Sequence, residues 1–295
     1  MSKQSFHQKL NRQLVLLEEK GQLLLLVRQI REDHPRMSSR QMYRLLRPVH
    51  LGRDRFEAFC FECGFKVSIK RNFHKTTNSL GVTRFENLLT HYELKSINQV
   101  WVSDITYYRI GEKFYYLTFF LDLYSRVIVG HSVSDNLSTK GTTIPAAKVA
   151  LKARNIKPGL IIHSDGGGQY YCKEWLDLTR HHKIQNSMCE SPYENAHAER
   201  INGIIKNDYL AGYSPASLDQ LVTMTMKAVE KYNIEKPHGA LGNLSPYQYE
   251  SVSNNPSSTN QKKEKKNQKK KRRRNVDNSR RVTHIPAMTI ITITN

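Results

Sequence analysis

The chain has 295 residues, and its 46 lysines and arginines against 26 aspartates and glutamates give a formal net charge of +20. So large a positive charge indicates an anionic partner or a solvated tail, and the apolar share of 38% lies below the roughly 45–50% of globular chains. The apolar runs are far shorter than the ~18 residues of a membrane span, and four cysteines are too few for a disulfide scaffold, so both of those classes are excluded.

The positive charge is concentrated in two flanks of the chain. Residues 1–75 and residues 262–274 each carry a net charge of +9, whereas residues 76–261 carry +1. This division is typical of a nucleic-acid-binding protein whose basic segments neutralise phosphates. The alternative is that residues 262–274 are only a solvated, disordered tail, which the Ser, Asn and Pro residues at 251–261 separate from the rest.

Three short helices are predicted at the start of the chain. Tight turns between them indicate a helix-turn-helix module, whose last helix enters the major groove of DNA. Arg53 and Arg55 would lie near the start of that helix, and Arg40 and Arg44 would be available to phosphates. The alternative is a three-helix adaptor with solvated arginines. The expected helices cover residues 22–33, 39–46 with Ser38 or Ser39 as the cap, and 53–63, and each is followed by a proline or a glycine.

The middle of the chain is predicted to be a mixed α/β sheet with helices on its faces. Residues 99–110, 114–123 and 127–133 are rich in β-branched and aromatic residues and are separated by short breaks. This pattern indicates three consecutive antiparallel strands. The elements expected next are a helix at 139–154, a strand at 159–163, a helix at 171–181 and a strand at 184–188. A long helix is then expected to open with a capping box at 191–194 and to run to about residue 210.

Three carboxylates lie where this topology can bring them together. Asp104 is inside the first strand, where a charge needs a partner, and Asp165 ends the fourth strand, at the edge where open α/β sheets bind ligands. Glu199 lies in the last helix. Clustered carboxylates repel one another and select a hard cation, Mg²⁺ or Mn²⁺, and two such ions can promote displacement at phosphorus. The alternative is that Asp104 begins a turn and Glu199 is an exposed helix residue.

The residues around these acids resemble the insertion-sequence-three transposases, members of the retroviral-integrase superfamily with a ribonuclease-H-like core. The similarity covers about residues 22–250. Glu194 and Lys236 stand where the family commonly has Asp and Arg, and both differences keep the charge. The motifs that carry the resemblance are WVSDITY at 101–107, LDLYSR at 121–126, HSDGGGQY at 163–170, ENAHAE at 194–199 with Lys206, and the pairs Tyr232-Asn233, Pro237-His238 and Leu241-Gly242.

The resemblance implies a metal-dependent polynucleotidyl transferase. Asp104, Asp165 and Glu199 would be the catalytic residues and would bind two Mg²⁺ or Mn²⁺ ions, while Gln169 and Lys206 would contact DNA nearby or be ordinary surface residues. The implied domains are a helix-turn-helix-like DNA-binding module at 1–75, an integrase-type catalytic core at 96–250 with a C-terminal helical extension, and a linker with a disordered basic tail at 251–295. The core is expected to have a five-stranded mixed sheet.

The same resemblance implies partners and a location. The chain would cleave the ends of an insertion sequence in double-stranded DNA and join them to a target, as a homo-oligomer associated with the nucleoid in the bacterial cytoplasm. It is similar to the family's second reading frame, which is often fused by frameshifting to an upstream DNA-binding segment. Activity could therefore depend on that partner.

Other functions remain compatible with the sequence. One is a DNA-binding regulator that retains the fold without catalysis, which the basic N-terminal module favours. Another is a nuclease acting on RNA in hybrids, which does not explain that module. Cys60 and Cys63 have the spacing of half a zinc site, with His74 following, but no second pair lies nearby, so we expect a packing role for at least one of them.

If the basic run at 262–274 contacts phosphates, its deletion should flatten the salt dependence of DNA binding without moving the site of cleavage. The measurement is the slope of log affinity against log salt for the full and the truncated chain. An unchanged slope would identify the run as a solvated appendage.

Overall fold

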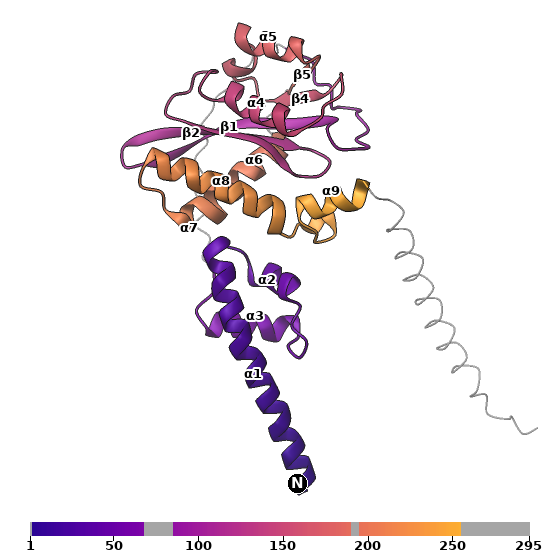
Figure 1. Ribbon diagram of the computed structural model, residues 1–295, viewed down its shortest axis with the longest axis vertical. Coiled ribbons are helices and arrows are strands. Elements are labelled where there is room, and N and C mark those ends of the chain that lie inside the picture. The colour runs from indigo at the N-terminus through magenta and orange to yellow at the C-terminus, as the bar shows by residue number, and fades with distance from the viewer. Residues whose placement is uncertain (1, 68–84, 190–194, 255–295) are drawn as a thin grey trace, which may run out of the picture. The chain divides into compact units, whose positions relative to one another are not determined.

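The computed structural model describes residues 2–67, 85–189 and 195–254 (Figure 1). Its contacts divide the chain into two units, Met1–Tyr249 and Glu250–Asn295. The expected capping box at 191–194, His74 and the basic run at 262–274 lie outside the described residues. In the part of the chain that is described, no helix is long and apolar enough to cross a membrane.

The expected helices at the start of the chain are present as α1 (Lys3–Asp33), α2 (Ser39–Leu46) and α3 (Arg53–Glu62). Ser38 caps α2 in a reciprocal capping box with Gln41. The prediction that the first helix begins at residue 22 was wrong, because α1 begins 19 residues earlier, after the cap Ser2. The earlier turns of α1 also carry apolar residues at helical spacing, and these are exposed, whereas the part that packs on α2 and α3 is buried; the exposed residues are Phe6, Leu10, Leu14 and Leu17. The small core of these helices contains Leu23, Val27, Met42, Phe56 and Phe59.

The central sheet has five strands in the order β3-β2-β1-β4-β5. The first three strands along the chain form an antiparallel meander, as expected, while β4 pairs parallel to both β1 and β5. The mixed five-stranded sheet predicted from the sequence is therefore confirmed. The strands are β1 (Val100–Ile110), β2 (Lys113–Asp122), β3 (Ile128–Ser134), β4 (Ile161–Ser164) and β5 (Gln185–Met188).

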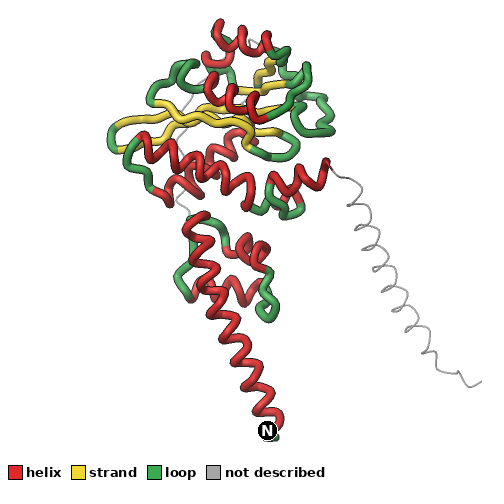
Figure 2. The backbone as a smooth tube through the Cα atoms, in the orientation of Figure 1, coloured by secondary structure: helices red, strands yellow, loops and turns green. Residues whose placement is uncertain are grey.

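Helices cover both faces of the sheet (Figures 1 and 2). On one face, α4 (Thr143–Ala153) and α5 (Lys173–His181) pack over Trp101 and Phe120. On the other face, α6 (Ala196–Gly203) and α8 (Leu218–Glu235) pack over Val102 and Phe119. Adjacent residues of one strand thus belong to different cores, because side chains alternate across a sheet. The remaining short elements are η1 (Gly168–Tyr170), α7 (Ala211–Tyr213), η4 (Gly239–Leu241) and α9 (Pro246–Asn254).

The long helix expected to run to residue 210 is not uniform. It is α-helical in α6, becomes a π-helix at Ile204–Leu210 and ends in α7. A π-helix bonds each residue to one five positions away, and its residues have no distinctive pattern in the sequence. Ile205, Tyr209 and Leu210 of this segment are buried, so the wider turn keeps an apolar face against the core.

Polar contacts join the end of α1 to the helices of the central domain. The His34 ring bonds the Tyr209 hydroxyl through Nδ1 and the Glu235 carboxylate through Nε2, both at 2.9 Å. Lys231 bridges Asp33 at 2.9 Å and Glu235 at 2.7 Å. Burial lowers the pKa of His34 despite the adjacent Glu235, which favours a neutral ring that donates to Glu235 and accepts from Tyr209.

Close packing of β3 on α4 gives a first prediction. A Cβ added at Gly130 would lie 2.3 Å from the Ala146 carbonyl oxygen and 2.7 Å from the Ala150 Cβ. Gly130→Ala must therefore push α4 away from the sheet, and we expect it to lower the free energy of unfolding by about 1–3 kcal/mol. Thermal unfolding followed by circular dichroism measures this change.

Gly21→Ala is the matched control. Gly21 lies inside α1 with no atom within 4 Å of an added Cβ, so the change should stabilise the helix by about 0.5–1 kcal/mol. Effects of the same sign at both glycines would contradict this account of the packing.

Candidate active site

The strand register brings Asp104 and Asp165 to neighbouring strands. Ser103 of β1 lies opposite Ser164 of β4 in the parallel pair. The residue after each of these serines is an aspartate: Asp104 lies within β1, and Asp165 directly follows the end of β4, at the edge where open α/β sheets bind ligands. The prediction that adjacent central strands would place the two aspartates side by side is therefore confirmed.

Asp104 is the most strongly perturbed of the three predicted acids. Its side chain is mostly buried, and burial together with the charges of Asp165 and then Glu199 raises its pKa to about 7. The N–H of Ile105, 2.9 Å from Oδ1, and the ammonium of Lys206 act in the opposite direction. The three carboxylates therefore lie close enough for their charges to interact.

Asp165 is held at the start of the glycine loop that follows β4. Burial raises its pKa, while the N–H of Gly167, which donates to Oδ1 at 3.3 Å, opposes that shift. The loop is anchored to the strand that carries Asp104, because the hydroxyls of Tyr170 and Ser103 share a hydrogen bond of 2.8 Å. Tyr170 thus couples the positions of the two aspartates.

Two asparagines fix the helix that carries Glu199. Asn195 donates to the carbonyl of Ser103 at 3.0 Å, and Asn202 donates to Oδ2 of Asp104 at 2.7 Å. They lie four residues before and three residues after Glu199, so all three residues belong to one side of the helix. Glu199 itself is exposed, at a place where a ligand can reach it.

Sequence reasoning did not identify the roles of Asn195 and Asn202. Their spacing around Glu199 was the available signal, since polar residues three and four positions from a functional helix residue share its face. Each is buried, and the Oδ1 of each lacks a hydrogen-bond partner within the described residues. These oxygens are further acceptors beside the acids.

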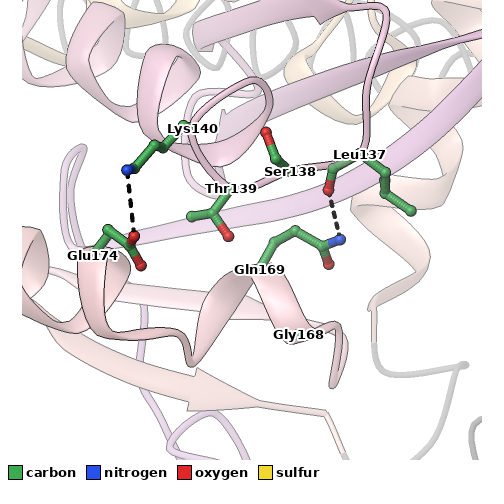
Figure 3. A pocket seen from close by; sticks show the side chains of 7 residues that line it. All are labelled: Leu137, Ser138, Thr139, Lys140, Gly168, Gln169 and Glu174. Atoms are coloured by element: carbon green, nitrogen blue, oxygen red, sulfur yellow. Dashed lines mark hydrogen bonds and ion pairs between the residues drawn. The ribbon is translucent and has the colours of Figure 1, made fainter.

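The two residues predicted to contact DNA near the acids lie in different settings. Lys206 follows on the same helix as Glu199, donates to the Thr106 hydroxyl at 2.8 Å and lies 5.0 Å from the centre of the Tyr107 ring. Gln169 donates to the carbonyl of Leu137 at 2.9 Å and lines a shallow pocket after Asp165 (Figure 3). Their contact with DNA stays a prediction.

The four arginines predicted to contact DNA in the first helices are not equivalent. Arg40 bonds Glu57 at 3.2 Å, and Arg53 bonds Asp54 at 2.8 Å and approaches Glu57 to 3.9 Å. Arg44 and Arg55 are exposed, and no described carboxylate lies within 4.0 Å of either. The structure thus pairs two of these arginines with acids of the same module.

Cys60 of α3 and Cys63, which follows that helix, do not form a metal site with other described residues. Cys60 is buried, which raises the pKa of its thiol to about 11, whereas Cys63 is exposed. This arrangement agrees with the expected packing role.

The three acids suit a divalent cation by their chemistry. Among the described residues, no group of three or more His, Cys, Asp and Glu side chains is already arranged to hold a metal ion. The acids nonetheless form an oxygen-only set, and their mutual repulsion helps to keep Asp104 protonated to about pH 7. A hard cation would relieve that repulsion, so the residues present fit such an ion.

The sheet order and the acids at its edge define an integrase-type core. Two family models described as integrase core domain match residues 95–193 and 180–246. The chain is 33% identical over 203 residues to an uncharacterized 31 kDa protein of insertion element IS600 from Shigella sonnei, covering 67% of this chain and 74% of that protein. It is 30% identical over 193 residues to the transposase InsF of insertion sequence IS3A from Escherichia coli, covering 64% and 67%.

The chain belongs to the insertion-sequence-three (IS3) family of transposases. It also matches solved retroviral integrases. The catalytic core domain of HTLV-2 integrase in complex with magnesium is 23% identical, with a TM-score of 0.44, over 52% of this chain and 97% of that chain. The core of BIV integrase is 16% identical, with a TM-score of 0.42, over 55% and 99%.

The raised pKa of Asp104 predicts a pH dependence of stability. In the unfolded chain this carboxyl ionises near pH 4, whereas in the folded chain it keeps its proton to about pH 7. Folding therefore takes up a proton between these values, and stability falls as the pH rises through that window. Asp104→Asn removes this loss, so without metal at about pH 8 it should raise the free energy of unfolding by on the order of 1–3 kcal/mol.

Thermal unfolding in EDTA across that range of pH measures the effect. Asp177→Asn is the control, because Asp177 is an exposed residue of α5 that pairs only with Arg180 among the described residues. If Asp104→Asn is no more stable than the wild type at the upper end of the range, the pKa of Asp104 is not raised in the folded chain.

Proposed function

We propose that this chain catalyses metal-dependent cleavage of DNA at the ends of an insertion sequence and transfer of those ends to a target. Asp104, Asp165 and Glu199 are the catalytic, metal-binding residues in this proposal. The observation that carries it is the raised pKa of Asp104, which two other carboxylates help to produce at an open sheet edge. Such perturbed acids are typical of functional sites.

The bound cations, Mg²⁺ or Mn²⁺, would neutralise charge at the attacking and leaving oxygens of the phosphate. The protein groups supply position. Asn202 holds one oxygen of Asp104, Gly167 holds one oxygen of Asp165 and Asn195 ties the start of α6 to β1. These hydrogen bonds keep the acids at one edge in spite of their repulsion. Because the acids are already in position, less free energy is needed to organise the site when DNA binds.

The surroundings of the acids suit a DNA strand. The loop at 166–168 has only glycines, so no side chain keeps a sugar-phosphate backbone away from Asp165. Lys206 adds a positive charge beside Asp104, and Gln169 lines the pocket beyond the loop. The basic segment at residues 1–75 would bind further phosphates, and the active form would be an oligomer assembled on double-stranded DNA.

Substitution of the acids tests the reaction. Asp104→Asn, Asp165→Asn and Glu199→Gln should each reduce cleavage of a duplex that carries the element's ends by at least about 10³-fold, because each removes a charge that the transition state requires. DNA affinity should stay within about threefold of the wild type, since the contacts that bind the backbone remain. Gel assays of cleavage and strand transfer with Mg²⁺ measure the first effect, and fluorescence anisotropy measures the second.

Asp219→Asn, at the exposed start of α8, serves as the control and should cleave like the wild type. Mg²⁺ should raise the melting temperature of the wild type but not that of Asp104→Asn. Full cleavage by Asp104→Asn would refute the assignment of the acids. If the wild type binds the ends without cleaving them, with or without the upstream segment, the chain is a DNA-binding regulator.

A further inference from the structure

Three aromatic rings share one face of the hairpin that β1 and β2 form. The strand register pairs Tyr107 with Tyr116 and Arg109 with Phe114, and residues directly opposite each other in an antiparallel pair lie on the same face. Because side chains alternate along a strand, these rings lie on the face of Trp101, over which α4 and α5 pack nearer the middle of the sheet. Tyr107, Tyr116 and Phe114 are called the aromatic platform below.

The aromatic platform is open to solvent. Phe114 keeps 48% of its surface exposed, Tyr107 and Tyr116 are half-buried, and none of the three belongs to a hydrophobic core of the described residues. Their neighbours on the same face, Ile105 and Phe120, pack into the core instead. A group of exposed rings that no core requires is typical of a binding surface, and such rings are what nucleic-acid bases stack on.

Lys206 connects the aromatic platform with the proposed catalytic acids. Its ammonium donates to the Thr106 hydroxyl at 2.8 Å, lies over the Tyr107 ring at 5.0 Å from the ring centre, and acts electrostatically on Asp104. Thr106 and Tyr107 point to opposite faces of β1. The Lys206 side chain can contact both because β4 pairs with β1 only as far as Ser103, so that no described strand lies on that side of β1 beyond it.

The Tyr107 ring is supported from within the hairpin. Phe114 packs against it at an interplanar angle of 85°, with the ring centroids 5.4 Å apart, which is a favourable arrangement for two aromatic rings. The contact of Tyr107 with the Lys206 ammonium is weaker than the stacking of a base on an aromatic ring. A base can therefore displace the ammonium from the ring, and the ammonium can then pair with the phosphate of the same nucleotide.

The distance between the aromatic platform and Asp104 suits a nearby nucleotide of a strand bound at the acids. Tyr107 follows Asp104 by three residues in β1, which is about 10 Å at the rise of an extended strand. Successive nucleotides in one strand of B-DNA are separated by about 3.4 Å along the helix axis, so the ring lies about three nucleotide steps from the acid. The exposed Arg109, opposite Phe114, adds a positive charge that attracts phosphates to this face.

We propose that the aromatic platform binds an unpaired base of the DNA strand engaged at the catalytic acids, with the base stacked on the Tyr107 ring. The inference rests on the proposed function for the identity of the strand, and it adds a contact that requires single-stranded DNA. A base inside a duplex is already stacked on its neighbours, so only a base that has left the helix can contact the ring. The contact tolerates any base, because every base has an aromatic face.

The test compares labelled duplexes of one mixed sequence in binding to the full chain, with EDTA present so that no cleavage occurs. One duplex is blunt, and two others carry a short single-stranded tail, one on each strand. The wild type should prefer a tailed duplex, and Tyr107→Val should bind that duplex about 10-fold more weakly because one stacked base is lost. Valine keeps the β-branched shape that strands favour. Tyr107→Trp should stay within about threefold of the wild type, and neither variant should change the slope of log affinity against log salt, since the ring carries no charge.

Tyr115→Leu is the matched control. Tyr115 belongs to the same hairpin but packs against the core on the opposite face, so its loss should lower the melting temperature without changing the preference for the tailed duplex. Phe114→Thr is a second test, because a ring that is 48% exposed can be removed at little cost to folding. It should weaken the preference about threefold, since Tyr107 loses its aromatic support. Melting temperatures of all variants are measured in parallel.

The proposal is overturned if the wild type has no preference for a tailed duplex, if folded Tyr107→Val keeps that preference, or if Tyr107→Trp or Tyr115→Leu loses it as fully as Tyr107→Val. If Tyr107→Val does not fold, Phe114→Thr decides, and an unchanged preference in that variant overturns the proposal. Failure of the proposed function gives a different result. In that case the wild type shows no cleavage with Mg²⁺, whether or not the preference for the tail depends on Tyr107.

Discussion

The gathering of carboxylates at one edge of the sheet, where Asp104 is both buried and close to other negative charges, is the constraint on which the rest of this structure depends. Parallel pairing of β1 with β4 brings Asp104 and Asp165 together, and α6 adds Glu199. Ionised carboxylates repel one another and would move apart if nothing held them. The surrounding bonds prevent this, because Tyr170 links the glycine loop to β1 and Asn195 and Asn202 link α6 to the same strand.

Much of this site could be predicted from the sequence. The β-branched meander, the charge of Asp104 inside a strand and the position of Asp165 after an apolar run are local patterns, and the parallel neighbour relation follows from the order of elements. The hydrogen bonds of Asn195 and Asn202 could not be predicted, since an asparagine in a helix can equally face solvent. What each contacts depends on the register of α6 against β1.

The parts that the sequence did not predict differ in their physical origin. The first turns of α1 have apolar residues at helical spacing but leave them exposed, so no buried core marks where the helix begins, and the π-helix after α6 differs from an α-helix only in its bonding.

The order of the strands has a consequence for how the molecule assembles. The meander β1-β2-β3 joins neighbours along the chain, whereas β4 returns to β1 only after two further strands and a helix. Contacts between distant segments cost more chain entropy and slow folding more than local ones. Of the three acids, the meander contains only Asp104, so it can form without bringing the acids together. The cost in chain entropy of assembling the three acids falls on the long-range steps, in which β4 pairs with β1 and α6 packs on the sheet.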